Sequence, residues 1–207
     1  MKILALEFSS NQRGVAVSED ENILSTVNTD NLKTSPLSLI DDALRKACLD
    51  RTTIEIITLS IGPGSYTGIR SAIATAQGWE LARNIKILPI SSPEILAATA
   101  RFHGRTGKTD FVINAQRQEY YHSIWDLTET NQNEITPLRI IGAIEATKLS
   151  AFGPDIKDLP KATQLYPAAA KLAQLAASRT NFQLGEEIEP IYLRATEFVK
   201  APPPRRL

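Results

Sequence analysis

Alternating and continuous runs of apolar residues divide the first half of the chain into short strands. Residues 2–8, 14–19 and 22–28 each read as a strand, and the tight polar turns between them predict an antiparallel meander. Residues 54–62 form a continuous apolar run, which is typical of a strand buried on both faces. Residues 85–90 predict a further strand.

Three helices are expected between and after these strands. Ser35 and Pro36 give a good N-cap and first helical position, and an apolar stripe follows, made of Leu37, Ile40, Leu44 and Ala47. A second helix, about 68–84, is rich in small residues, which are Ala72, Ala74, Ala76 and Gly78. Residues 93–103 predict the third helix. The order βββαβαβα predicts an α/β fold with a mixed sheet covered by helices.

A polar, glycine-containing break at 103–110 predicts a boundary between two lobes, 1–103 and a smaller one at 104–207. The second lobe is expected to hold strands near 111–115, 119–127 and 137–141, a loop at 128–134, a short helix near 143–149 and a helix over 166–179. The proline-rich end, "APPPRRL", predicts an extended arm.

Composition narrows the possible functions. The 207 residues carry 23 Lys and Arg against 23 Asp and Glu, and this zero net charge argues against tight non-specific binding to nucleic acid. A single cysteine, Cys48, excludes an internal disulfide and any multi-cysteine metal site. No apolar run approaches the roughly 18 residues that span a bilayer, and the start lacks a signal-peptide pattern, so we expect a cytoplasmic protein without a membrane segment.

The loop between the buried strand and the second helix is the strongest local signal. Its glycines and helix start could hold an anion or nucleotide phosphate, and the candidate residues are Gly62, Gly64, Ser65, Thr67, Gly68 and Arg70. The same pattern is equally typical of a tight strand-to-helix turn. The loop lacks the lysine of a Walker A motif and the arrangement of a nucleophile elbow.

Other groups of residues give weaker indications of a functional site. Glu7, Ser9 and Ser10 follow the first strand and could lie near a phosphate, or form an ordinary polar hairpin. His103 and His122 have no metal-ligand spacing, so no metal site is expected. The segment 117–125 interleaves charge and aromatics, which fits sheet packing or stacking on a base.

Four segments together resemble the TsaB (YeaZ) family of the ASKHA superfamily. They read "ILALEFSSNQRGVAV", "IGPGSYTGIRSAIATAQGWELARNIKILPISSPEILA", "INAQRQEYYHSIWDL" and "EPIYLRATEFVKAPPP". Residues 62–70 match the family pattern G-P-G-S-[FY]-T-G-[LIV]-R at every position. The resemblance implies a two-lobe ASKHA fold, which is actin-like or RNase H-like, with mixed sheets flanked by helices.

The resemblance also implies a function. Such proteins help to form N6-threonylcarbamoyladenosine next to the anticodon of tRNAs that read ANN codons, as non-catalytic scaffold subunits without a cofactor. They pair with a TsaD-like catalytic paralogue, a TsaE-like ATPase joins the pair, tRNA is met only through the complex, and a homodimer is possible in isolation. The implied interface lies on the first two helices, at Leu37, Ile40, Leu44, Ile69, Ala72, Ile73 and Ala76.

Three departures from the family pattern bear on function. Glu7 stands where the family has Asp, Asn114 replaces another Asp, and Thr34-Ser35 replaces His-Ser. These changes weaken any nucleotide site inside this subunit. The alternatives are an ASKHA-type phosphotransferase or ATPase acting alone, a peptidase, and a binding module with an unrelated partner.

Overall fold

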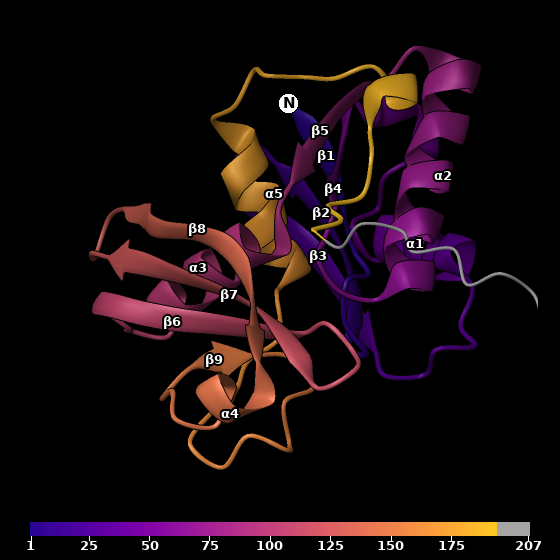
Figure 1. Cartoon of the computed structure of the whole chain (residues 1–207). Helices are drawn as coiled ribbons and strands as arrows, with labels where there is room; N and C mark the ends of the chain where they lie inside the picture. The colour runs from indigo at the N-terminus through magenta and orange to yellow at the C-terminus, as the bar shows by residue number, and fades with distance from the viewer. Residues whose placement is uncertain (194–207) are drawn as a thin grey trace, which may run out of the picture.

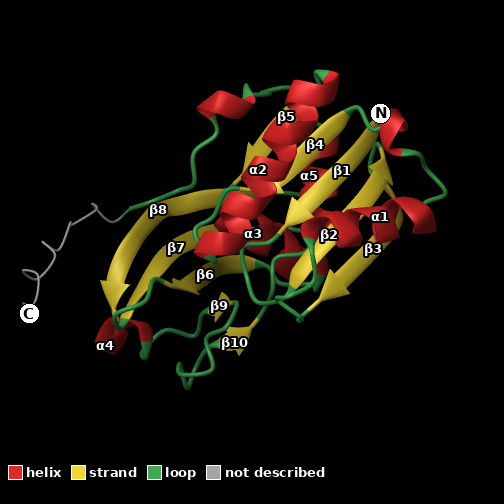
Figure 2. Ribbon diagram, turned by 90° about the vertical axis from the view of Figure 1, so that its right-hand side faces the viewer, coloured by secondary structure: helices red, strands yellow, loops and turns green. Residues whose placement is uncertain are grey.

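The computed structural model describes residues 1–193, and the proline-rich arm expected at the end lies outside them. Two five-stranded sheets form the framework (Figures 1 and 2). The first has the order β3-β2-β1-β4-β5 and the second has the order β10-β9-β6-β7-β8. This arrangement confirms the expected α/β class with mixed sheets.

The first sheet combines a meander with parallel crossovers. Its strands are β1 (Lys2–Glu7), β2 (Arg13–Glu19), β3 (Asn22–Thr29), β4 (Ile56–Ser60) and β5 (Lys86–Ile90). The first three are antiparallel, as predicted, and β4 pairs in parallel with both β1 and β5. Parallel strands need crossovers, and these are supplied by α1 (Pro36–Lys46) with η1 (Arg51–Thr53), and by α2 (Tyr66–Arg83).

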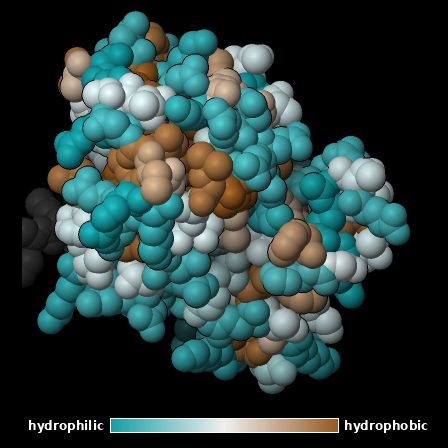
Figure 3. All heavy atoms as spheres, turned by 180° about the vertical axis from the view of Figure 1, so that it is seen from behind, coloured by the Kyte–Doolittle hydropathy of each residue, from teal (hydrophilic) through white to brown (hydrophobic). Residues whose placement is uncertain are grey.

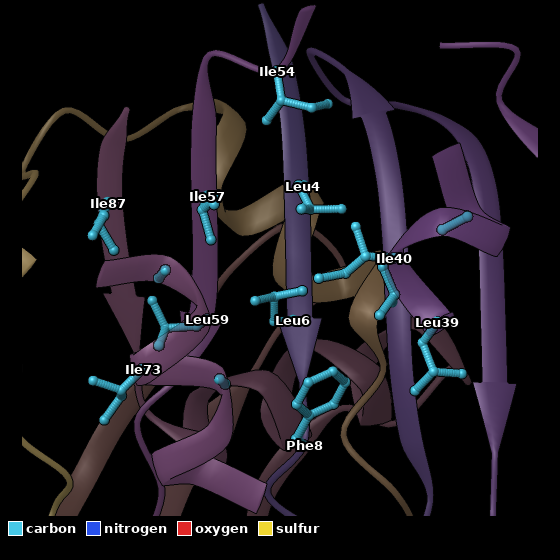
Figure 4. Close-up of a cluster of buried hydrophobic side chains, with 14 of the residues drawn as sticks. Leu4, Leu6, Phe8, Leu39, Ile40, Ile54, Ile57, Leu59, Ile73 and Ile87 are labelled. Atoms are coloured by element: carbon cyan, nitrogen blue, oxygen red, sulfur yellow. The ribbon is translucent and has the colours of Figure 1, made fainter. Parts of the chain in front are cut away.

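Alternation along β1 sends side chains into two separate cores. Leu4, Leu6 and Phe8 pack with α1 and α2 on one face, as Figure 4 shows. Ile3 and Ala5 face the other side, where they meet α5 (Ala169–Ala177) and Ile95 of α3 (Ser92–Phe102). Because both faces are covered, the central strands are apolar throughout.

The second sheet extends further than its apolar runs predicted. Its strands are β6 (Gly107–Asn114), β7 (Glu119–Leu127), β8 (Gln132–Gly142), β9 (Phe152–Gly153) and β10 (Thr163–Gln164), and the short helix is α4 (Ala143–Ala146). The loop expected at 128–134 ends earlier because β8 begins at Gln132 and pairs with Leu127. Most side chains along β8 are exposed or half-buried, so hydrophobicity gave little sign of its first half.

Helix α3 joins the two lobes. Its Leu96, Ala97 and Ala100 pack with Phe111 and Trp125 of the second sheet, while Ile95 packs on the first. The division into lobes at residue 103 stays a prediction. Helix α5 lies in the predicted second lobe by sequence, yet it packs on the first sheet (Figure 1). After α5 come η2 (Gly185–Glu187) and a segment that returns to the first lobe, where Ile188 is buried. Within residues 1–193, no helix is long and apolar enough to cross a membrane.

Candidate functional site

The glycine-rich loop brings the start of α2 against the end of β1. A Cβ on Gly68 would lie 1.9 Å from the carbonyl oxygen of Phe8, and one on Gly64 would lie 2.1 Å from that of Ser9. Gly62 and Gly64 have φ values of 94° and 152°, in the region that favours glycine. The glycines are therefore required by close backbone packing.

Several backbone groups of this loop are hydrogen-bonded inside the chain. The N–H of Ser65 donates to the carbonyl of Ser9 at 2.7 Å. The Ser65 hydroxyl caps α2 by accepting from the N–H of Gly68 at 3.3 Å, and the Ser65 carbonyl accepts from Ile69. Thr67 and Arg70 are exposed. Together with the close backbone packing of Gly64 and Gly68, this pattern favours the tight-turn interpretation over an anion cradle.

Glu7, at the end of β1, is fully buried among serine residues. Its Oε1 accepts hydrogen bonds from the N–H (2.8 Å) and hydroxyl of Ser9, while its Oε2 is buried without a partner. The hydroxyls of Ser60 and Ser92 lie 2.8 Å apart beside it. Burial raises the pKa of Glu7 to about 7, against the lowering effect of the Ser9 hydrogen bonds and of the nearby Ser60 hydroxyl.

This burial limits what the carboxyl group can do. Glu7, Ser9 and Ser10 are all buried, so the predicted acidic and hydroxyl groups do come together but do not face solvent. The described residues contain no group of three or more His, Cys, Asp or Glu that could hold a metal ion.

Asn114, the second departure, has a local structural role. Its Oδ1 accepts from the N–H of Gln116 at 2.7 Å and so caps the β6–β7 turn. Three successive residues of that turn, Gln116, Arg117 and Gln118, have positive φ values of 54–65°. An amide oxygen serves this turn without placing a charge there.

The lobes also meet at the β1–β2 turn. The N–H of Asn11 donates to Oδ2 of Asp155 at 3.0 Å, and the Tyr166 hydroxyl donates to Oδ1 of the same carboxylate at 3.2 Å. The first of these bonds joins residues 144 positions apart in the sequence, and the second holds the Asp155 carboxylate from within its own segment.

Of the remaining candidates, His122 and the β7 aromatics are buried, whereas His103 and Cys48 are exposed. His122 is buried and its Nε2 lies 2.7 Å from Oδ1 of Asp110, whereas His103 is exposed at the end of α3. In β7, Tyr120 and Trp125 are buried on the two faces of the second sheet, which favours the sheet-packing interpretation of residues 117–125. Cys48 is exposed after α1, with a φ of 54°.

Six of the seven expected interface side chains lie in the protein's own core. They are Ile40, Leu44, Ile69, Ala72, Ile73 and Ala76, and all are buried against the first sheet. Leu37 is 59% exposed, and Leu39 takes its expected place in the core. The expected face is thus the inner face of α1 and α2, because the helices must first cover the sheet.

The outer face of α2 is smooth and uncovered. Ala74 and Gly78 are exposed one turn apart, and a Cβ on Gly78 would meet nothing within 4 Å. One turn further, the Leu81 side chain is 88% exposed. Seen from behind, apolar side chains also gather on the half that holds the first sheet (Figure 3). The i, i+4 spacing of Ala74 and Gly78 was the available sequence signal for this face.

A polar cluster continues this face toward the start of α2. Tyr66 and Arg70 lie there one turn apart, and Tyr192 of the C-terminal segment joins them. Sequence reasoning placed Arg70 in the anion loop and did not connect it with either tyrosine.

Comparison with known proteins identifies the family. The family model described as "TsaD: tRNA N6-adenosine threonylcarbamoyltransferase" matches residues 30–137, just over half of the chain. The tRNA threonylcarbamoyladenosine biosynthesis protein TsaB of Bacillus subtilis is 24% identical over 66% of this chain and 60% of its own length. The TsaB protein of Buchnera aphidicola subsp. Schizaphis graminum is 31% identical over 58% of each chain. The chain thus spans less than two thirds of these relatives.

Solved structures agree with the fold. The solved structure of YeaZ from Pseudomonas aeruginosa superposes with a TM-score of 0.77 at 23% identity, and the match covers 93% of this chain and 99% of that one. A second structure, of a protein described as similar to the peptidase YEAZ, gives a TM-score of 0.79 at 24% identity with the same coverage. These likenesses confirm the expected two-lobe architecture. The chain belongs to the tRNA N6-adenosine threonylcarbamoyltransferase (TsaD) family, and within it resembles the proteins named TsaB and YeaZ.

Proposed function

We propose that this chain is a non-catalytic scaffold subunit in the cytoplasmic complex that forms N6-threonylcarbamoyladenosine next to the anticodon of tRNAs reading ANN codons. It pairs with a TsaD-like catalytic paralogue, and a TsaE-like ATPase joins the pair. tRNA is bound only through the complex. The names of the curated relatives support the pathway.

The observation that carries the scaffold role is the outer face of α2. Ala74 and Gly78 leave the helix backbone nearly bare, so that a partner helix can approach closely. Leu81, 88% exposed at the end of this face, would gain most from being covered. The partner face proposed here is therefore the outer face of α2 together with Leu37, and the buried residues support it from beneath.

The decisive experiment mixes this chain with the TsaD-like protein of the same organism and measures mass by light scattering on a sizing column. We expect a one-to-one heterodimer, and an active tRNA modification assay once the TsaE-like protein is added. Two separate folded peaks would contradict the proposal. Alone, two copies of this chain can pair through the same face, which the same column would detect as a doubled mass.

Ala74→Arg tests the face itself. A long charged side chain on the smooth face should prevent the heterodimer while the protein stays folded, since Ala74 points to solvent. Ser178→Arg is the matched control, because Ser178 is a small exposed residue just after α5, on the other side of the first sheet. If both variants bind the partner equally well, the interface lies elsewhere.

The alternative, an ATPase or phosphotransferase acting alone, needs Glu7 to reach a phosphate–metal group. Its burial among serines argues against that access. ATP hydrolysis by the isolated chain that disappears in Glu7→Gln would favour this alternative over the scaffold role.

A further inference from the structure

Two tyrosines and one arginine form a compact cluster on the surface at the start of α2. The Cζ of Arg70 lies 4.3 Å from the centre of the Tyr66 ring and 5.9 Å from that of Tyr192. The Nε of Arg70 donates to the Tyr192 hydroxyl at 3.0 Å. The two rings are 6.3 Å apart and tilted by 35°. We call Tyr66, Arg70 and Tyr192 the tyrosine–arginine cluster.

The framework fixes this cluster in place. Tyr66 and Arg70 lie one turn apart at the capped end of α2. Tyr192 is held next to them because Ile191 donates its N–H to the carbonyl of Ile61 at 2.9 Å and Ile188 is buried in the core. The guanidinium therefore loses little freedom when it binds a ligand.

The cluster nevertheless offers unused donors. Within residues 1–193, the two terminal nitrogens of Arg70 have no hydrogen-bond acceptor and no carboxylate within ion-pair distance. The Tyr66 hydroxyl likewise has no partner in that part of the chain. The Tyr66 and Tyr192 side chains are 60% and 50% exposed. A planar fork of N–H donors between two aromatic rings fits a carboxylate bound through both oxygens.

Position and composition indicate the source of that carboxylate. Arg70, Ala74 and Gly78 follow one another at four-residue intervals, so the cluster continues the outer face of α2. Tyrosine and arginine are, with tryptophan, enriched among the residues that dominate binding energy in protein interfaces. We propose that the tyrosine–arginine cluster anchors a carboxylate side chain of the TsaD-like partner; this inference rests on the proposed function.

Charge favours a protein carboxylate over an RNA phosphate. Residues 1–193 hold 19 Lys and Arg against 22 Asp and Glu, a net charge of −3. Arg70 is the only charged residue between the start of α2 and Glu80. A site for an RNA backbone needs a basic stripe, which this described surface does not provide. The Arg70 guanidinium, a single cation held in one orientation, is suited to bind one acidic side chain.

The test measures calorimetric affinity of the full chain for the TsaD-like partner. We expect Arg70→Gln to raise the dissociation constant at least tenfold and to make binding less dependent on salt concentration. Arg70→Lys should restore only part of the loss, because an ammonium cannot form two parallel bonds to one carboxylate. Arg101→Gln is the matched control, since Arg101 lies on α3 and forms no ion pair among the described residues. Thermal midpoints of all variants should stay close to wild type.

The possible outcomes separate the two proposals. If the wild type binds the partner and Arg70→Gln binds equally well, the anchor is overturned and the scaffold role stands. If the wild type does not bind, both are overturned. A loss that appears in tRNA binding instead of partner binding would overturn the protein carboxylate. Glu197 is the one acidic residue of the segment 194–207, which lies outside the described residues. Equal losses of thermal stability in Arg70→Gln and Glu197→Gln would place the carboxylate in this chain, and would overturn the proposal too.

Discussion

Gly68 in the first turn of α2 packs directly on the backbone of Phe8, at the end of β1. Because a Cβ on Gly68 would lie 1.9 Å from the Phe8 carbonyl oxygen, Gly68→Ala must displace either the helix or the strand. We expect a loss of about 3 kcal/mol in the free energy of unfolding, measured with denaturant. Gly78→Ala is the matched control: it adds the same methyl group to open space in the same helix, and should stabilise by about 0.5–1 kcal/mol. Equal effects would contradict this account of the loop.

Leu39 is buried in the first turns of α1, whereas Leu37, with which the predicted apolar stripe began, is exposed. Leu39 is buried between α1 and the first sheet, so Leu39→Ala should cost about 3 kcal/mol of unfolding free energy. Leu37→Ala should change stability by no more than about 0.5 kcal/mol, because its side chain is 59% exposed. Denaturant midpoints of the two variants decide the matter, and a larger loss for Leu37→Ala would disprove the orientation of α1.

Ala76 and Ala74 should separate folding from association. Ala76 is fully buried against the first sheet, so Ala76→Arg should prevent folding, detected as loss of the cooperative unfolding transition. Ala74→Arg should unfold at the wild-type temperature, because its side chain reaches water. A folded Ala76→Arg protein that had lost only its partner would instead place the interface on the inner face.

Glu7 should make stability depend on pH. Its pKa is near 7 in the folded protein, above the ordinary value of 4.5, so the folded state holds a proton that the unfolded state releases. The free energy of unfolding should therefore fall as pH rises from 4.5 through 7, by about 3 kcal/mol in total. Relative to the wild type, Glu7→Gln should lack this decline. Parallel stability curves for the two proteins between pH 4.5 and 8 would show that Glu7 does not titrate there.

The central strands of the first sheet, β1 and β4, were predictable because burial on both faces leaves a nearly unbroken apolar run. The inner and outer faces of α2 could not be predicted. Ala72, Ala74 and Ala76 carry the same small side chain, so hydrophobic periodicity cannot tell which of them is buried. The sheet lies on one side, and it selects Ala72 and Ala76 for burial.

The candidate site, too, could be predicted only in part from the sequence. The sequence left Gly64 and Gly68 open between an anion loop and a tight turn, and the structure packs both glycines against the backbone at the end of β1. The partnership of Arg70 with Tyr192 joins residues 122 positions apart, and no local pattern encodes it. The burial of Glu7 was equally hidden, since a carboxyl at the end of a strand normally faces water.

Helix α5 covers the face of the first sheet formed by Ile3, Ala5 and Ala16, although it comes more than 150 residues after them. During synthesis, that apolar face therefore stays uncovered by α5 until α5 has left the ribosome. A chain interrupted at residue 103 would present the face to water or to chaperones. The first sheet is thus completely covered only after the strands of the second sheet have been synthesised.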